Sequence, residues 1–347
     1  MRSSLAKIAD YPAHLEACWQ EHLALRADDA PTVLSTFAGC GGSSLGYSMA
    51  GFRELLAVEW DDNAVATFKL NFPDVPVYHG DIGKLSVSEC LERAGLEPGQ
   101  LDVFDGSPPC QGFSTAGKRV FDDDRNQLFR EFARLLQGLQ PRVFVMENVS
   151  GMVKGKMKLI FSEILRELKS SGYRVSARLL NAMYFGVPQS RQRLIFVGVR
   201  EDLGIEPSHP RAETRPVTVR EAFASLADNK ADRVVPDEES KTLSQMTAVR
   251  PGLRCSLHHS RHRLSSFKSS PTVDRGGRTG GWQIWHPVEN RPITRAEVKR
   301  LGSFPDGCQF AGSISNAFER IGNSVPPLMM RSIARHIRRE ILTRADA

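Results

Sequence analysis

The sequence predicts an α/β protein, with a mostly parallel, doubly wound sheet and a second, smaller irregular domain. Two observations support this fold class. Up to about Arg200, short apolar runs rich in branched residues alternate with longer stretches of helical periodicity. Beyond Arg200 the periodicity weakens, and Arg, His, Ser and Gly become frequent up to about Arg291. The second region is therefore expected to form a separate lobe.

Strands are expected where apolar runs end in glycine, proline or polar residues. In chain order they are 31–37, 55–59, 77–79, 101–104, 142–146, 173–180 and 194–199. Helices are expected over about 5–26, 126–139, 158–170 and 294–301, and from about 327 to 343. Because helices separate most of the strands, the strands are expected to run mainly parallel.

Composition limits the kind of protein. The chain has 347 residues, of which 41% are hydrophobic and 25% charged, as in ordinary globular proteins. Without a membrane-length apolar run or a signal-peptide core, we expect a cytoplasmic protein that does not enter a membrane. Six cysteines without a Cys-x-x-Cys pair argue against a disulfide framework or a zinc ribbon. The net charge of +6 permits a nucleic-acid partner.

One cysteine stands in an unusual turn, within Asp105 to Ser114 (Asp-Gly-Ser-Pro-Pro-Cys-Gln-Gly-Phe-Ser). The glycine and the two prolines prevent both a longer strand and an immediate helix. A stiff turn therefore presents Cys110 at the carboxyl edge of the sheet, where open α/β sheets bind ligands. A reactive cysteine needs electropositive surroundings that lower its pKa. Taken alone, the turn fits an inert loop cysteine better.

A glycine-rich loop follows the first expected strand, and an acid follows each of the next two strands, Glu59 and Asp81. This is the layout of a site for an adenosine-containing ligand. Ser44 stands where the dinucleotide fingerprint has its third glycine, which weakens the case for NAD. A nucleoside cofactor without a pyrophosphate fits better, and S-adenosylmethionine is the common one. Trp60 is placed either to stack on an adenine or to fill the core.

A second glycine motif, Gly112 to Lys118, has the spacing that begins a phosphate-binding P-loop. Arg119 follows it, in place of the Ser or Thr that holds magnesium. The motif also follows a Pro-Pro-Cys turn and not a strand. We interpret the match as accidental and keep a nucleotide hydrolase as the alternative from another class.

Several stretches together resemble the DNA (cytosine-5)-methyltransferase family, in the family's order and over most of the chain. They are the cofactor loop Phe37–Gly42, the Pro-Cys loop Asp105–Ser114, the Glu-Asn-Val signature Glu147–Val149, the Gln-x-Arg-x-Arg element Gln189–Arg193, the stretch Arg291–Pro305 and the C-terminal motif Gly322–Pro326. The departures are Ser35-Thr36 before the cofactor loop, Ile293 and Gly302. None of these removes a catalytic group.

The resemblance implies a Rossmann-like S-adenosylmethionine-dependent methyltransferase domain in residues 1–200, completed by about 310–347, and a target-recognition domain in 201–309. It also implies methyl transfer to carbon 5 of a flipped cytosine in a specific double-stranded DNA sequence, through a covalent bond between Cys110 and C6. The expected product is S-adenosylhomocysteine, and no metal is expected. The alternatives are an RNA cytosine-5 methyltransferase and an inactive sequence-specific DNA-binding protein.

By this resemblance the catalytic residues are Cys110, Glu147, Arg191 and Arg193. Glu147 is expected to hydrogen-bond or protonate cytosine N3, and Arg193 to contact O2. Arg191 and Arg193 would supply a positive field for the thiolate. The ordinary interpretations are a helix-capping partner for Glu147 and surface ion pairs for the arginines. The expected cofactor-binding residues are Phe37, Ala38, Gly39, Gly41, Gly42, Glu59, Trp60, Asp81, Ile82, Pro109, Leu128, Asn323 and Ser324.

Two regions are expected to contact DNA. The segment 114–124 is predicted to close over the duplex, through Ser114, Lys118 and Arg119. In the recognition region the candidates are Arg254, Arg261, Arg263, Arg275 and Arg278, of which most would contact phosphates and one in 275–281 would read guanine. Cys255, His258, His259 and His262 lack a standard zinc spacing. We expect a stand-alone bacterial enzyme that acts as a monomer, either orphan or with a cognate restriction endonuclease that cuts the same site without direct contact.

Overall fold

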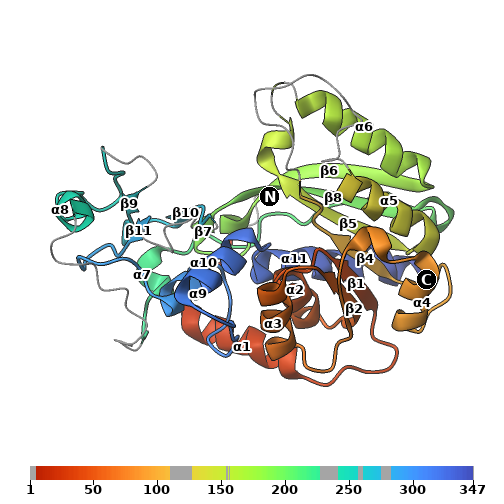
Figure 1. Ribbon diagram of the computed structural model, residues 1–347, viewed down its shortest axis with the longest axis horizontal. Helices are drawn as coiled ribbons and strands as arrows, with labels where there is room; N and C mark the ends of the chain where they lie inside the picture. The colour runs from red at the N-terminus through yellow and green to blue at the C-terminus, as the bar shows by residue number, and fades with distance from the viewer. Residues whose placement is uncertain are drawn as a thin grey trace.

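A central sheet organises the computed structural model, which describes residues 5–109, 127–153, 155, 157–226, 241–256, 261–274 and 283–346. In this part of the chain the sheet has seven strands in the order β3-β2-β1-β4-β5-β8-β6 (Figure 1). Its strands are β1 Thr32–Thr36, β2 Arg53–Glu59, β3 Val77–His79, β4 Val103–Gly106, β5 Val143–Val149, β6 Tyr173–Asn181 and β8 Gln192–Arg200. Five neighbours, from β3 to β5, run parallel, whereas β8 runs antiparallel to β5 and β6. The predicted mostly parallel, doubly wound sheet is confirmed.

The strand order reverses direction at the β1–β4 pair. The chain moves outward from β1 to β2 and β3, then returns to place β4 on the other side of β1. In open α/β sheets, the crevice outside the carboxyl ends of such a strand pair is where ligands bind. The glycine loop follows β1 and the Pro-Pro-Cys turn follows β4, so the topology brings both to this crevice.

Helices cover both faces of the sheet. Side chains alternate between the two faces along each strand, and apolar side chains on both faces are buried under helices. Val33, Ala57 and Val145 belong to one core, together with residues of three helices: α1 (Tyr11–Leu23), α2 (Gly42–Met49) and α11 (Pro327–Ile337). Leu34, Leu56 and Phe144 belong to the opposite core, together with residues of α4 (Val87–Ala94), α5 (Gln127–Leu139) and α6 (Met157–Ser170). Figure 1 shows α5 and α6 on the other side of the sheet from α2 and α11.

Polar side chains fix where several helices begin. Asp61 caps α3 (Asp62–Asn71), and Thr294 and Ser313 form capping boxes at α9 (Arg295–Leu301) and α10 (Ile314–Asn323). The expected C-terminal helix is present as α11, followed by the π-helical turn η8 (Arg338–Leu342) and α12 (Thr343–Ala345). The short 3-10 turns are η1 (Ile82–Lys84), η3 (Ser150–Val153), η4 (Ala182–Tyr184) and η5 (Glu201–Leu203). None of the helices described is long and apolar enough to span a membrane.

The region after Arg200 is irregular, as expected. It contains α7 (Val219–Ala222), α8 (Lys241–Thr247) and the two-residue strands β9 (His262–Arg263), β10 (Ser270–Pro271) and β11 (Ile284–Trp285). Met246, Cys255 and Trp285 form a small core of their own. Figure 1 places α8, β9 and β11 well away from the sheet, while β10 pairs with β7 (Gln189–Ser190) near it. The boundaries 1–200 and 201–309 stay predictions.

Candidate active site

The glycine loop after β1 is held open by backbone geometry and by Glu59. Phe37, Gly39 and Gly41 have φ angles of 54°, 57° and 88°, a region that glycine adopts readily and other residues rarely. The Glu59 carboxylate accepts hydrogen bonds from the amide of Gly39 at 2.7 Å and from those of Trp60 and Asp61 at 2.9 Å. The acid at the end of β2 therefore fixes the path of the loop.

The surroundings of this loop fit an adenosyl ligand. A side chain added at Gly39 would meet no atom within 4 Å, so the loop borders open space there. The Trp60 ring beside it is 78% exposed, which leaves its face available for stacking on a base. Asp81 is exposed and caps η1 through the Gly83 amide at 2.9 Å. Its carboxylate and that of Glu59 are suited to ribose hydroxyls.

The C-terminal motif packs directly against this loop. A Cβ at Gly42 would lie 2.5 Å from the Val325 carbonyl oxygen, and the Cys40 sulfur lies 3.1 Å from Ser324 Oγ. An ion pair of 2.7 Å between Arg320 of α10 and Asp61, which follows Glu59 and Trp60, lies nearby and joins α10 to the start of α3. The motif near residue 324 thus completes the loop, as the expected order of motifs requires.

The remaining cofactor candidates differ in exposure. Asn323 is exposed, whereas Pro109, Leu128 and Ser324 are partly buried. Ile82 is 5% exposed and lies in the core on the α5 face of the sheet. Ala38 is 8% exposed and belongs to the core on the α2 face. Contact between these two side chains and a cofactor stays a prediction.

The turn that precedes Cys110 is anchored to both neighbouring strands. Gly106 pairs with Thr36 of β1, and a Cβ at Gly106 would come within 2.4 Å of Thr36 Oγ1. On the other side, the Asn148 amide of β5 donates to the Pro108 carbonyl at 3.2 Å. Cys110 itself lies outside the described residues. The sequence analysis did not assign Asn148 a role, although it belongs to the quoted Glu-Asn-Val signature.

Two of the predicted catalytic residues lie side by side. Arg193 Nε is 2.7 Å from Glu147 Oε1, and the two side chains are 14% and 12% exposed. Glu147 lies near the carboxyl end of β5 and Arg193 near the start of the antiparallel strand β8, so both face the same edge of the sheet. The site therefore presents a carboxylate and a guanidinium together, close to the turn that carries the cysteine.

Arg191 is placed differently. It is 2% exposed, and its guanidinium donates to the carbonyls of Val273 at 2.9 Å and Gly322 at 2.8 Å. The pKa of Arg191 is lowered to about 9, mainly by burial and also by the charge of Arg193, while the charge of Glu147 opposes the shift. The guanidinium thus joins the connection between β7 and β8 to Val273, in the irregular region after Arg200, and to Gly322 of α10. In this position Arg191 stabilises the packing of these segments. Its charge also acts on the site, because it interacts with the charges of Arg193 and Glu147.

A buried polar contact that the sequence analysis missed lies behind the turn. The Tyr47 hydroxyl of α2 donates to Asp105 Oδ1 at 3.1 Å, across 58 residues of sequence. Burial raises the pKa of Asp105 to about 7, a shift that Tyr47 reduces and the charge of Glu147 increases. No local pattern identifies this pair, because the two residues meet only in the folded sheet.

The predicted DNA contacts divide into three groups. Arg254 is exposed and Arg261 partly buried, as suits residues at or near a surface. Arg263 is 4% exposed, and its guanidinium donates to the Met246 carbonyl at 2.9 Å and to Asn290 Oδ1 at 2.6 Å. Because these bonds occupy the guanidinium within the lobe, Arg263 has a structural role here and not the expected DNA contact. Outside the described residues lie Ser114, Lys118, Arg119, Arg275 and Arg278.

Two sequence interpretations fall wholly or partly outside the described residues. The P-loop-like stretch from Gly112 to Lys118 is one of them, together with the segment predicted to close over DNA. For the zinc interpretation, His258 and His259 are likewise outside, and Cys255 packs in the small core of the second lobe. In the part of the chain that the structure describes, no group of three His, Cys, Asp or Glu side chains is arranged to hold a metal.

The strand order, the glycine loop and the paired acids define a Rossmann-like methyltransferase that uses S-adenosylmethionine. Solved structures agree. A candidate DNA modification methyltransferase from an Escherichia coli prophage superimposes with a TM-score of 0.76 at 26% identity, over 90% of this chain and 99% of that one. Dnmt2 of Spodoptera frugiperda, at 19% identity and a TM-score of 0.66 over 92% of this chain and 100% of its own, shows the same fold.

Sequence comparisons define the family. Residues 32–339 match the C-5 cytosine-specific DNA methylase family. The Type II methyltransferase M1.HphI of Haemophilus parahaemolyticus is 35% identical, over 87% of this chain and 85% of its own. M.XorII of Xanthomonas oryzae pv. oryzae is 32% identical over 88% and 84%. The chain belongs to the C-5 cytosine-specific DNA methylase family. It is a DNA cytosine methyltransferase whose methyl donor is S-adenosylmethionine, and the RNA and inactive alternatives are not favoured.

Proposed function

We propose that the chain methylates a flipped cytosine in a specific double-stranded DNA sequence, with Cys110 as the nucleophile. The observation that carries this proposal is the Glu147–Arg193 pair, 2.7 Å apart, at the sheet edge where the turn before Cys110 is anchored. Cytosine N3 and O2 are adjacent atoms on one edge of the base. A carboxyl and a guanidinium side by side match that edge.

In the proposed reaction, the Cys110 thiolate forms a bond to cytosine C6, which turns C5 into a carbon nucleophile. The Glu147 carboxyl holds a proton at N3, so that the charge pushed into the ring by the attack is neutralised. Arg193 donates to O2 and keeps the base in register. After C5 has gained its methyl group, the C5 proton leaves to a base, the C6–S bond breaks, and the thiolate is restored.

The residues proposed to bind the cofactor surround the open space beside Gly39. S-adenosylmethionine supplies the methyl group as an electrophilic carbon on a sulfonium sulfur, and S-adenosylhomocysteine is the product. We propose that Trp60 stacks on the adenine and that Glu59 and Asp81 accept hydrogen bonds from the ribose hydroxyls. The Phe37–Gly42 loop and Asn323–Ser324 would form the walls. These residues need no metal for the transfer.

The turn before Cys110 is anchored between β1 and β5 at the edge of the protein sheet. A cytosine that stays stacked inside a DNA duplex cannot reach it. We therefore propose that the target cytosine is flipped out, at a cost of a few kcal/mol that contacts to the base and backbone offset. The irregular lobe after Arg200 is proposed to read the sequence. Because one chain carries all the proposed groups, we propose that it acts as a monomer. Its similarity to Type II methyltransferases supports a role as the modification enzyme of a restriction system.

Trapping on DNA that contains 5-fluorocytosine tests the proposal. Fluorine at C5 cannot leave as a proton does, so the C6–S bond should persist once the methyl group has been transferred. We expect wild type to form a covalent adduct with duplex DNA that depends on S-adenosylmethionine and resists denaturation. Cys110→Ala should form none, although it should still bind the cofactor.

Two results would overturn the proposal. One is the absence of any adduct from active wild-type enzyme, and the other is an adduct that survives in Cys110→Ala. A parallel reaction with 5-fluorocytosine RNA tests the substrate class, and we expect no adduct there. Methylation-sensitive sequencing of DNA from cells that express the chain would then identify the target sequence.

A further inference from the structure

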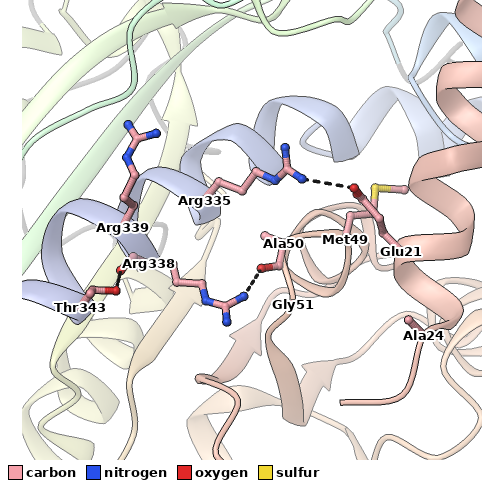
Figure 2. Close-up of a pocket in the computed structure, with 9 residues that line it drawn as sticks. All are labelled: Glu21, Ala24, Met49, Ala50, Gly51, Arg335, Arg338, Arg339 and Thr343. Atoms are coloured by element: carbon pink, nitrogen blue, oxygen red, sulfur yellow. Dashed lines mark hydrogen bonds and ion pairs between the residues drawn. The ribbon is translucent and has the colours of Figure 1, made fainter. Parts of the chain in front are cut away.

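A cavity of about 470 Å³ lies far from the proposed site. Its walls come from the end of α1, the turn between α2 and β2, and the C-terminal helical segment (Figure 2). The turn residues Ala50 and Gly51 lie between the end of α2 and the start of β2 at Arg53, whereas Glu59 ends that strand. The cavity is therefore at the amino edge of the sheet, opposite the edge that carries the glycine loop.

The cavity is strongly basic. Arg335, Arg338 and Arg339 line it from one helical segment, at a spacing that puts all three on the same face. Figure 2 shows Arg335 and Arg338 reaching toward the opposite wall, where Arg338 donates to the Ala50 carbonyl at 3.2 Å. Glu21 is the acid among the lining residues, and its carboxylate already accepts from Arg331 at 2.7 and 2.8 Å and from Arg335 at 3.2 Å. Arg339 is paired with Glu340 at 2.7 Å.

A further arginine adds to this charge. Arg26 donates to the Ser48 carbonyl at 2.6 Å, beside the same turn. Burial lowers the pKa of Arg26, and the nearby charge of Arg338 lowers it too, although Glu21 raises it. Glu21 and Glu340 offset part of the positive charge of Arg335 and Arg339. The remaining like charges on one helix face are destabilising, so an anion in the cavity would reduce their repulsion.

The helix that supplies the arginines is irregular at this place. Arg338 and Arg339 begin the π-helical turn η8, which replaces regular α-helix for five residues. Such turns are rare and occur often at functional sites. The backbone conformation of a π-helical turn is less stable than that of an α-helix, so we expect the turn to serve a function. Here it directs two consecutive arginines, Arg338 and Arg339, to the cavity.

We propose that this cavity binds a small ligand with two or more linked phosphate groups, such as a nucleoside polyphosphate. Guanidinium groups match phosphate oxygens with paired, charge-assisted hydrogen bonds. The volume lies within the range of small-molecule sites, about 300–1,000 Å³. Met49 and Ala24 provide apolar wall for the part of the ligand that carries no charge. The edge of the sheet proposed to bind DNA is opposite the edge that carries this cavity.

Isothermal titration of the full-length protein with inorganic triphosphate, and separately with adenosine triphosphate, tests the proposal. Saturating S-adenosylhomocysteine keeps the nucleotide out of the cofactor site, and sodium chloride holds the ionic strength constant. We expect saturable binding to wild type. The double variant Arg335→Gln/Arg339→Gln should bind at least about tenfold more weakly, because it loses charge-assisted hydrogen bonds.

Arg344→Gln is the matched control, since Arg344 is exposed on the next helical turn and does not line the cavity. It should bind both probes like wild type. Methyl-transfer activity of the double variant should equal that of wild type, which verifies its folding. The proposal is overturned if neither probe binds, if the double variant binds as tightly as wild type, or if the control loses as much affinity as the double variant. It is also overturned if cytosine-free duplex DNA displaces the probes, because the site would then hold a nucleic-acid backbone.

Discussion

A carboxylate and a guanidinium are both costly to remove from water alone, and each lowers the cost of the other when they are paired. Glu147 and Arg193 are such a pair at the end of an apolar strand, with less than a sixth of either side chain exposed. The sequence analysis named Glu147 and Arg193 as separate contacts to the base, Glu147 at N3 and Arg193 at O2. The structure adds an opposite charge 2.7 Å away, which keeps both groups in place before a base arrives.

Glu147→Gln tests the chemistry of this pair. Glutamine keeps the shape and a hydrogen bond to Arg193, but it cannot hold a transferable proton at N3. We expect the methyl-transfer rate to fall by about 10²–10⁴-fold, the usual contribution of a general acid, while the midpoint of urea unfolding changes little. Transfer of labelled methyl groups to duplex DNA measures the rate. A variant with the wild-type rate would contradict the assigned role.

Asp105 gives a prediction on pH. Burial raises its pKa from 3.8 to about 7, so between these values the folded protein keeps a proton that the unfolded chain loses. The free energy of unfolding therefore falls as pH rises from about 4 to 7. Glu54, whose pKa burial raises to about 8, acts in the same direction. Asp105→Asn cannot titrate but keeps an acceptor for Tyr47, so we expect its stability to fall less over this range.

Urea unfolding of both proteins at several pH values between about 5 and 8 measures this difference. The buried histidines His22 and His209 have lowered pKa values of about 4, and they make stability rise with pH instead. Because they are present in both proteins, they cancel in the comparison. Equal pH dependence of wild type and Asp105→Asn would show that Asp105 is ionised in the folded state throughout.

The burial and the hydrogen-bond partners of individual arginines were the features hardest to predict from the sequence. Arginine is rarely buried, so the sequence analysis expected Arg191 to supply a positive field for the Cys110 thiolate and Arg263 to contact DNA. Both instead donate to carbonyls inside the protein. The segments that supply these carbonyls are distant in sequence, and nothing in the local pattern indicates which of several arginines they will bind. The ordered set of motifs identified Glu147 and Arg193 together, and the structure places them 2.7 Å apart; their catalytic roles stay predictions.

At the scale of elements, local patterns predicted the sheet well. β3 has the predicted bounds, and the other six strands of the sheet agree to within a few residues. Apolar runs that end in glycine or proline carry this information. The two-residue strands β7, β9, β10 and β11 were not predicted, because they exist only through pairing with distant segments. The π-helical turn η8 likewise breaks a helical pattern that the sequence continues.

The contact between the glycine loop and the C-terminal motif can be tested with one methyl group. In Gly42→Ala the new Cβ would lie 2.5 Å from the Val325 carbonyl and 2.9 Å from Ser324 Cβ, so one segment must move. We expect a loss of about 1–3 kcal/mol in stability, as for other overpacked sites, together with weaker binding of S-adenosylhomocysteine. Gly151→Ala is the control, since its Cβ would meet nothing within 4 Å. Equal cofactor affinity in both variants would contradict this packing.

At the scale of the whole molecule, three parts of the chain meet at Arg191. Its guanidinium joins the loop before β8 to Val273, in the irregular region after Arg200, and to Gly322 of α10. Gln189 acts beside it, accepting from the Val273 amide at 3.0 Å and donating to the Leu301 carbonyl at 3.1 Å. The Gln-x-Arg-x-Arg element thus has two separate tasks. Gln189 and Arg191 hold the parts of the molecule together, and Arg193 faces the site.

Arg191→Met separates a structural role of Arg191 from a catalytic one. Methionine fills much of the space but leaves the Val273 and Gly322 carbonyls without their donor, at a cost of about 1–3 kcal/mol each. We expect a clear fall in the free energy of unfolding by urea, and weaker DNA binding because the recognition region is held less firmly. The adduct of this variant on 5-fluorocytosine DNA should accumulate at a near-normal rate once DNA is saturating.

Arg193→Met should show the reverse, with slow adduct formation and nearly unchanged stability. If Arg191→Met kept full stability and lost the chemical step, the direct catalytic role first expected from the sequence would be correct.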